Sequence, residues 1–332
     1  MLLWIEFIIC TSVIVYSGIK LSKYGDVIAE KTGLGRTWIG VVLMASVTSL
    51  PELVTGISSV AVVGVPDIAV GDVLGSCVFN MAILAFLDAA HKEMPISAKA
   101  HHGNVLSAGF GILLLSVIAM GLFLKETAIS FGWVGLYSMV VLITYVIAVK
   151  LLFSYEKRRV AVLLEEGAEK LKYENIPLGT AVVNYGINAA IVVAAAVFLP
   201  KIGLGIAQTT GLGQTFVGNI FIAMATSLPE VVVSLAAVRM NAVDLAIGSL
   251  LGSNIFNILI LAVDDILFFK GPLLSFASQT HLISALSAIS MTTVAIIGLT
   301  YRAEKKFLLL AWDSLAILLI YCFNLALLYL LR

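Results

Sequence analysis

The chain has few charged residues for its length. Of its 332 residues, 12% are charged and 61% are hydrophobic. Soluble domains contain about 25% charged and roughly 45–50% apolar residues. The low charge and high apolar content exclude an ordinary soluble domain, and they indicate a polytopic membrane protein.

Several other features are missing. The three cysteines, Cys10, Cys77 and Cys322, are odd in number and lie inside apolar runs, which argues against a disulfide framework. No nucleotide-binding motif is present, so ATP-driven pumping has no support in the sequence. The first segment follows Met1 without a basic region or a small-residue cleavage site, and we expect a retained span rather than a signal peptide.

The apolar residues form ten runs, each long enough to cross about 30 Å of hydrocarbon. They lie at about 2–19, 37–64, 68–90, 104–124, 128–152, 178–199, 215–239, 244–268, 280–300 and 306–330. A polar segment at 154–177 separates the first five from the last five. The pattern predicts an all-α polytopic membrane protein with ten transmembrane helices, in two five-helix halves (1–153 and 178–332) joined by a linker.

The distribution of basic residues predicts the orientation. If the N-terminus faces outside, 16 of the 20 Lys and Arg residues fall in segments on the inner side. The exceptions are Lys125, Lys201, Lys270 and Arg332. Positive residues concentrate on the cytoplasmic side, so we expect a multi-pass protein of the cell membrane with both termini outside and the linker 154–177 in the cytoplasm.

An internal repeat relates the two halves. Ala45–Glu52 reads ASVTSLPE, and Ala223–Glu230, 178 positions later, reads AMATSLPE. Further matches flank these octapeptides, so the repeats extend over about 32–84 and 210–261. Because each half has an odd number of spans, the second half must enter the membrane in the opposite orientation. This inverted-repeat plan predicts a substrate site at the midplane, on broken helices.

Each octapeptide places a proline and a carboxylate in the middle of an apolar run. Pro51 frees a backbone carbonyl about one turn earlier, and an ionised Glu52 near the midplane costs at least about 2.5 kcal/mol. Thr48 lies four residues before Glu52, so the hydroxyl and the carboxylate share a helix face, and Ser49 adds a second hydroxyl. Such a combination indicates a site for a cation.

The following span of each half adds further oxygen donors. Ser76 and Asn80 lie four residues apart, and Ser253 and Asn257 are their counterparts in the second half. Carboxylate, amide, hydroxyl and carbonyl oxygens suit Ca²⁺, which accepts about 6–8 oxygen ligands, or Na⁺. The apolar runs contain no His and Cys constellation of the kind that soft transition metals prefer.

These motifs resemble the cation/calcium exchanger superfamily, which includes the sodium/calcium exchangers. Its repeats look like Gly-Thr-Ser-Leu-Pro-Glu followed by Gly-Ser-Asn-x-x-Asn/Asp. The resemblance implies ten transmembrane helices, with ions held between the second, third, seventh and eighth. It also implies a set of ligands, in which the two alanines contribute backbone carbonyls: Ala45, Thr48, Ser49, Glu52, Ser76, Asn80, Ala223, Thr226, Ser227, Glu230, Ser253 and Asn257.

The sequence departs from that pattern at two places. The glycine before Thr-Ser is Val47 in one half and Ala225 in the other. Both Asn80 and Asn257 are amides, whereas sodium/calcium exchangers generally carry an aspartate in at least one half. The two glutamates then supply two negative charges, which balance one Ca²⁺ or two Na⁺.

The resulting hypothesis is a secondary antiporter that exchanges Ca²⁺ for Na⁺, with H⁺ as the alternative coupling ion. We expect no enzyme activity, no cofactor, no nucleic acid and no obligate protein partner; the partners are the transported ions and the lipid bilayer. An intramembrane protease using Asp72 is the non-transport alternative, but the Gly-x-Gly-Asp context is absent. Asp72 could be an extra cation ligand, although we expect a hydrated residue near a helix end. We expect the repeat-related Asp88 and Asp265 at the membrane interface.

Overall fold

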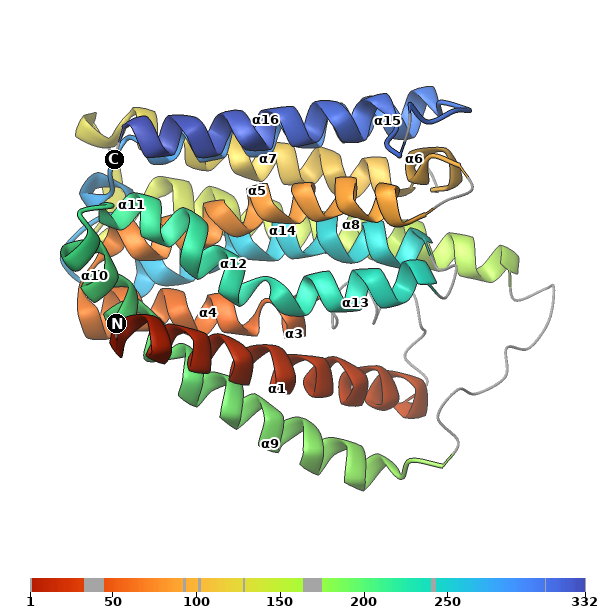
Figure 1. Cartoon of the computed structure of the whole chain (residues 1–332), viewed down its shortest axis with the longest axis horizontal. Helices are drawn as coiled ribbons and strands as arrows, with labels where there is room; N and C mark the ends of the chain where they lie inside the picture. The colour runs from red at the N-terminus through yellow and green to blue at the C-terminus, as the bar shows by residue number, and fades with distance from the viewer. Residues whose placement is uncertain are drawn as a thin grey trace.

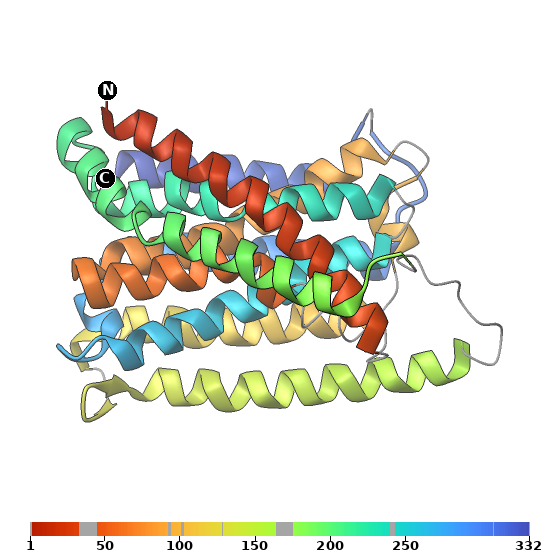
Figure 2. The same cartoon turned by 90° about the horizontal axis from the view of Figure 1, so that it is seen from below.

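The computed structural model describes residues 2–32, 45–91, 94–100, 103–127, 129–163, 175–239, 243–307 and 309–331. The described chain is mostly helical, and its long helices lie alongside one another in one bundle (Figures 1 and 2). The long helices are α1 (Leu2–Thr32), α5 (Pro66–Ala90), α7 (Gly103–Phe123), α8 (Leu136–Leu163), α9 (Leu178–Ala196), α14 (Val243–Leu267), α15 (His281–Tyr301) and α16 (Trp312–Leu330).

The lengths of these helices agree with a membrane-spanning protein. Among the described residues, eight helices are long and apolar enough to cross a bilayer. A ninth span results if Gln214–Thr226 and Leu228–Arg239, which meet at a 42° bend, count as one. The run predicted at 37–64 is described from residue 45 onward, as the shorter apolar helix Leu50–Val63. The remaining predicted runs all correspond to helices.

Short helical pieces make up the two segments that contain the repeated octapeptides. The first consists of α3 (Ala45–Thr48), α4 (Leu50–Ile57) and the π-helical η2 (Ser58–Val63). The second follows α10 (Leu199–Thr210) and consists of α11 (Gln214–Val217), the π-helical η5 (Gly218–Ile222), α12 (Ala223–Thr226) and α13 (Leu228–Arg239). The interruptions occur where the sequence predicts broken helices.

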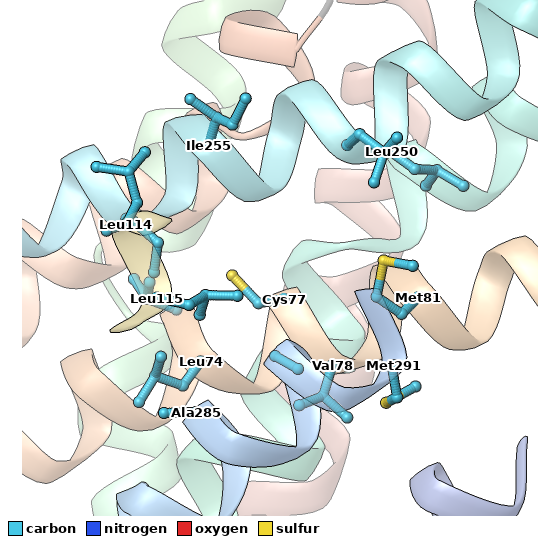
Figure 3. Close-up of a cluster of buried hydrophobic side chains, with 14 of the residues drawn as sticks. Leu74, Cys77, Val78, Met81, Leu114, Leu115, Leu250, Ile255, Ala285 and Met291 are labelled. Atoms are coloured by element: carbon cyan, nitrogen blue, oxygen red, sulfur yellow. The ribbon is translucent and has the colours of Figure 1, made fainter. Parts of the chain in front are cut away.

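Helices α5 and α14 form the centre of the bundle. In their most apolar 18-residue stretches, 89% of α5 and 83% of α14 is buried inside the protein, against 17% for α1. Figure 3 shows part of the apolar cluster around these helices, in which Val78 of α5 lies beside Met291 of α15. α1 and α9 pack together at one edge of the bundle, and α15 packs against α16 and α7 at the other (Figure 1).

One close approach fixes α5 against the second broken segment. A Cβ atom added to Gly75 would lie 2.3 Å from the backbone oxygen of Asn219 in η5. A side chain at this position is therefore excluded, because it would push the two backbones apart. The glycine of the Gly-Ser motif thus brings Ser76 close to the second half of the protein.

The repeat-related aspartates Asp88 and Asp265 are buried hydrogen-bond acceptors at the ends of α5 and α14. Each accepts from the backbone N–H eight residues later, with Ile96 N at 2.8 Å from Asp88 Oδ1 and Leu273 N at 2.6 Å from Asp265 Oδ1. Both are fully buried, so they lie at the helix ends as expected but are not hydrated interfacial charges.

Each of these aspartates also holds the chain that enters the last helix of the other half. Ala311 N, before α16, donates to Asp88 Oδ2 at 2.7 Å. Gly135 N, before α8, donates to Asp265 Oδ2 at 2.8 Å. Gly135 belongs to a short antiparallel hairpin of β1 (Ser130–Phe131) and β2 (Val134–Gly135). Asp88 and Asp265 therefore join the two halves through equivalent contacts, each at the C-terminal end of its own helix.

The predicted linker is described in part. Helix α8 continues to Leu163, ten residues beyond the predicted end of the first half at 153. Residues 164–174 of the linker, like 33–44 of the first repeat, lie outside the described residues.

Replacement of Asp265 with alanine should destabilise the protein strongly. The carboxylate also accepts from the hydroxyls of Tyr137 (2.5 Å) and Ser138 (2.6 Å), so its loss leaves buried donors without an acceptor. Each orphaned donor costs about 1–3 kcal/mol, and we expect the free energy of unfolding to fall by at least about 3 kcal/mol. Thermal unfolding in detergent measures this. The exposed Glu304→Gln serves as control, with an expected change within about 0.5 kcal/mol.

Candidate ion-binding site

The two repeated octapeptides form equivalent helix breaks. Ser49 separates α3 from α4 with φ −87° and ψ 12°, and Ser227 separates α12 from α13 with φ −87° and ψ 6°. The cause is local: a proline two residues later lacks a backbone N–H and crowds the carbonyl one turn before it. The break therefore falls within Thr-Ser-Leu-Pro-Glu in both halves.

The two breaks contact each other across the centre of the bundle. Ser227 Oγ donates to Glu52 Oε1 at 2.9 Å, and Ser49 Oγ donates to Glu230 Oε1 at 3.2 Å. All four side chains are completely buried. Each glutamate is thus held by the serine of the other repeat, and the two halves build one site together.

Helices α5 and α14 add a hydroxyl from each Gly-Ser motif. Ser76 Oγ donates to Glu52 Oε1 at 3.4 Å and lies 2.8 Å from Ser227 Oγ. On the other side, the hydroxyls of Thr48 and Ser253 are 3.5 Å apart. Ser49, Ser76 and Ser227 therefore contact the two glutamates directly, whereas the Thr226 hydroxyl contacts Asp72.

The two amides lie on the facing central helices. Asn80 and Asn257 are completely buried. Asn80 Nδ2 donates to Asn254 Oδ1 at 3.0 Å, and Asn254 Nδ2 donates to Cys77 O at 3.3 Å. The sequence analysis missed Asn254 as a residue that orients Asn80. The signal was available, because the repeat aligns Asn254 with Cys77 and so marks a polar residue found in one half alone.

The backbone carbonyls of Ala45 and Ala223 already accept hydrogen bonds within the protein. Ala45 O accepts from Ser49 N at 3.0 Å and from Thr48 Oγ1 at 3.3 Å. Ala223 O accepts from Ser227 N at 3.1 Å, and Thr226 Oγ1 lies 3.2 Å from it. Both carbonyls lie at the breaks as expected, but they are not free of hydrogen bonds.

Asp72 is part of this cluster, and the expectation of a hydrated residue near a helix end was wrong. Its side chain is completely buried, and its Oδ1 accepts from Thr226 Oγ1 at 2.8 Å. The helical spacing placed Asp72 on the face of Ser76, one turn away, and this was the signal for its position. The apolar neighbours that cover this turn come from other helices, so the sequence did not reveal the burial.

The cluster contains polar atoms whose hydrogen-bonding capacity is unused. Glu52 Oε2, Glu230 Oε2 and Asn80 Oδ1 are buried and find no hydrogen-bond partner among the described residues. Leaving ionised carboxylate oxygens unpaired in a low-dielectric interior is strongly unfavourable. Hard oxygen donors gathered around two carboxylates fit Ca²⁺ or Na⁺, and a bound cation would satisfy all three atoms.

Comparison with known proteins identifies the family. The sequence model of the family described as sodium/calcium exchanger protein matches residues 2–155 and 180–330. The chain belongs to this family. Its two matched segments correspond to the two halves that the internal repeat defines, and the family predicted from the repeated motifs is confirmed.

Individual relatives cover nearly the whole exchanger chain. The sodium/calcium exchanger MaX1 of Methanosarcina acetivorans is 24% identical over 329 residues, 90% of either chain. The solved structure of the sodium-calcium exchanger NCX_Mj superposes with a TM-score of 0.64 at 22% identity and covers 98% of both chains. The H⁺/Ca²⁺ exchanger CAX superposes with a TM-score of 0.71 at 14% identity, over 99% of this chain and 86% of its own.

These similarities establish the general class of the protein. The chain is a multi-pass membrane protein of a family of cation/Ca²⁺ exchangers, which are transporters and not enzymes. The solved structures with this fold include both an exchanger of sodium and an exchanger of protons. The coupling ion must therefore be inferred from the residues of the site.

Proposed function

We propose that this protein is a secondary antiporter that exchanges Ca²⁺ for Na⁺ across the cell membrane. The observation that carries the proposal is the reciprocal contact of the two broken helices, Ser227 with Glu52 and Ser49 with Glu230. It creates one buried, doubly acidic site out of two repeats. Two carboxylates balance one Ca²⁺ or two Na⁺, so the two ions compete for the same oxygens and exchange becomes obligatory.

The ligand set follows the repeats. We assign the backbone carbonyls of Ala45 and Ala223 and the side chains of Thr48, Ser49, Glu52, Ser76, Asn80, Thr226, Ser227, Glu230, Ser253 and Asn257. The alanine carbonyls must exchange a hydrogen bond for the ion, which requires a small adjustment of each helix break. Unwound backbone within a membrane is tolerated where it lines such a site.

The proposed architecture is ten transmembrane helices in two inverted five-helix halves. α5 and α14, which carry the same motif, run in opposite directions through the bundle (Figure 1). Asp88 and Asp265 make equivalent contacts at the C-terminal ends of these two helices, which lie at opposite ends of the bundle. Both observations support an inverted repeat, in which rocking of one half against the other exposes the midplane site to each side in turn.

Proton coupling is the second candidate. The observation that favours it is the pair of amides at Asn80 and Asn257, where sodium/calcium exchangers generally have at least one carboxylate. Two protons bound to the two central carboxylates would balance the charge of one departing Ca²⁺. Proton exchange therefore requires no carboxylate at Asn80 or Asn257.

Flux measurements in proteoliposomes distinguish the coupling ions. We expect vesicles loaded with radioactive Ca²⁺ to release it when a Na⁺ gradient is imposed at constant pH. Release driven by a pH gradient without Na⁺ would instead establish the proton exchanger.

Glu52→Gln and Glu230→Gln should each abolish Ca²⁺ transport while the protein still folds in detergent. Each change keeps the shape of the side chain but removes one of the two central negative charges. At an effective dielectric of roughly 20, the attraction between that charge and a cation 4 Å away is about 4 kcal/mol for each unit of charge on the cation. Ca²⁺ uptake is the measurement, and Glu304→Gln is the matched control on the surface. Uptake near the wild-type level in either variant would contradict the site.

Asn257→Asp should strengthen the Na⁺ dependence of Ca²⁺ flux or alter the number of Na⁺ ions coupled. A third carboxylate adds a negative charge at a buried position close to the proposed ions, where a cation gains several kcal/mol. Because a protonated carboxyl adds no charge, the flux should be compared between about pH 6 and 9. A Na⁺ dependence that stays unchanged over this range would show that the asparagine pair does not determine coupling.

The orientation can be tested by cysteine labelling in a background without the three native cysteines. A cysteine placed in the 160–170 linker should react from the cytoplasmic side, and one near Lys125 or Lys201 should react from outside. The basis is the concentration of basic residues on one side of the predicted topology. Labelling of the linker from outside in intact cells would reverse the orientation, and labelling of both positions from one side would contradict the inverted repeat.

A further inference from the structure

Two more carboxylates lie beside the central site. Asp264 of α14 is completely buried, and neither of its oxygens has a hydrogen-bond partner among the described residues. Asp72 of α5 is also completely buried, and its Oδ2 has no partner there either. Three carboxylate oxygens are therefore enclosed in the protein without a donor to compensate them.

The Asp264 side chain packs against α4, the helix that carries Glu52. A Cβ atom added to Gly56, one turn after Glu52 in α4, would lie 2.4 Å from Asp264 Oδ2. A glycine at this position thus leaves room for the carboxylate directly against the backbone. Helices α4, α5 and α14 all contact one another, so Asp264 lies at their junction.

Asp72 connects Asp264 to the central site. Its Oδ1 accepts from Thr226, a proposed ligand, and its helix α5 packs against both α4 and α14. The carboxylates of Glu52, Asp72 and Asp264 therefore lie on three helices in mutual contact, from the centre toward the end of α14. That end of α14 lies at the same end of the bundle as the two termini (Figure 1).

This series belongs to one side of the site. The repeat aligns Asp72 with Ser249, Asp264 with Leu87 and Gly56 with Ser234. The opposite route from the centre consequently lacks both carboxylates and the glycine. The two extra negative charges are an addition to the symmetric site and not a product of the duplication.

Resting on the exchange function proposed above, we propose that Asp72 and Asp264 bind an additional Na⁺ between α4, α5 and α14, adjacent to the central site. A cation held between them would compensate the three unpaired oxygens of the two buried carboxylates. The site supplies the charge that the amides at Asn80 and Asn257 do not provide.

Asp264→Asn should reduce the cooperativity of Na⁺ in Na⁺-driven Ca²⁺ flux. We expect the Hill coefficient for Na⁺ to fall by about one, because one coupled ion is lost while the central carboxylates are intact. Asp313→Asn is the matched control, since Asp313 is also buried against a glycine, Gly298, but lies on α16. An unchanged Na⁺ dependence in Asp264→Asn would overturn the site, even if proton release changed.

Gly56→Ala provides a second test, in which neither Asp72 nor Asp264 is replaced. The added methyl group displaces the Asp264 carboxylate, so we expect the same loss of Na⁺ cooperativity. Gly109→Ala is the control, because nothing lies within 4 Å of a Cβ atom at that position. If Gly56→Ala and Gly109→Ala show the same Na⁺ dependence as the wild type, the proposed position of the ion is wrong.

Binding measured in detergent separates this proposal from the transport function. Na⁺ without Ca²⁺ should raise the melting temperature of the wild type, since a ligand stabilises the folded state that binds it. In Asp264→Asn, the melting temperature should depend on the Na⁺ concentration as expected for one fewer bound Na⁺. Stabilisation of this variant by Ca²⁺ should persist. Absence of Na⁺-driven flux in the wild type would overturn the exchange function; identical Na⁺ stabilisation in wild type and Asp264→Asn would overturn the additional site.

Discussion

The structure depends on the cost of burying carboxyl groups in the interior of a membrane protein. Glu52 and Glu230 lie in completely buried positions, and each keeps one oxygen without a hydrogen-bond partner among the described residues. A folded protein can maintain this arrangement when a cation compensates the charge. The helix breaks, the serine hydroxyls and the close approach at Gly75 all bring oxygen atoms to that place.

Two pairs of completely buried aspartates differ in their hydrogen bonding. Asp88 and Asp265 accept hydrogen bonds from backbone N–H groups on the loops they hold, so they stabilise the fold. Asp72 and Asp264 retain unpaired oxygens in equally buried positions. Hydrogen-bond satisfaction, rather than burial, therefore distinguishes Asp88 and Asp265 from Asp72 and Asp264.

Duplication explains the central site, and departures from it explain what is specific to this chain. The reciprocal serine–glutamate contacts repeat in both halves. The Asn254 side chain that orients Asn80, and the carboxylate of Asp72, each occur in one half, because the repeat has Cys77 and Ser249 at the corresponding positions. Two duplicated halves can thus carry an asymmetric set of charges.

The sequence by itself determined the class of the protein, the repeat and the family, because apolar runs and the Thr-Ser-Leu-Pro-Glu motif act over short distances along the chain. The helix breaks followed for the same reason, since proline acts on its own turn. Pairing of Ser49 with Glu230 and of Ser227 with Glu52 joins residues 181 and 175 positions apart. The tertiary structure decided these contacts, the burial of Asp72 and the position of Asp264 against Gly56. Each of them depends on which helices pack together, and the periodicity of a single helix carries no information about its neighbours.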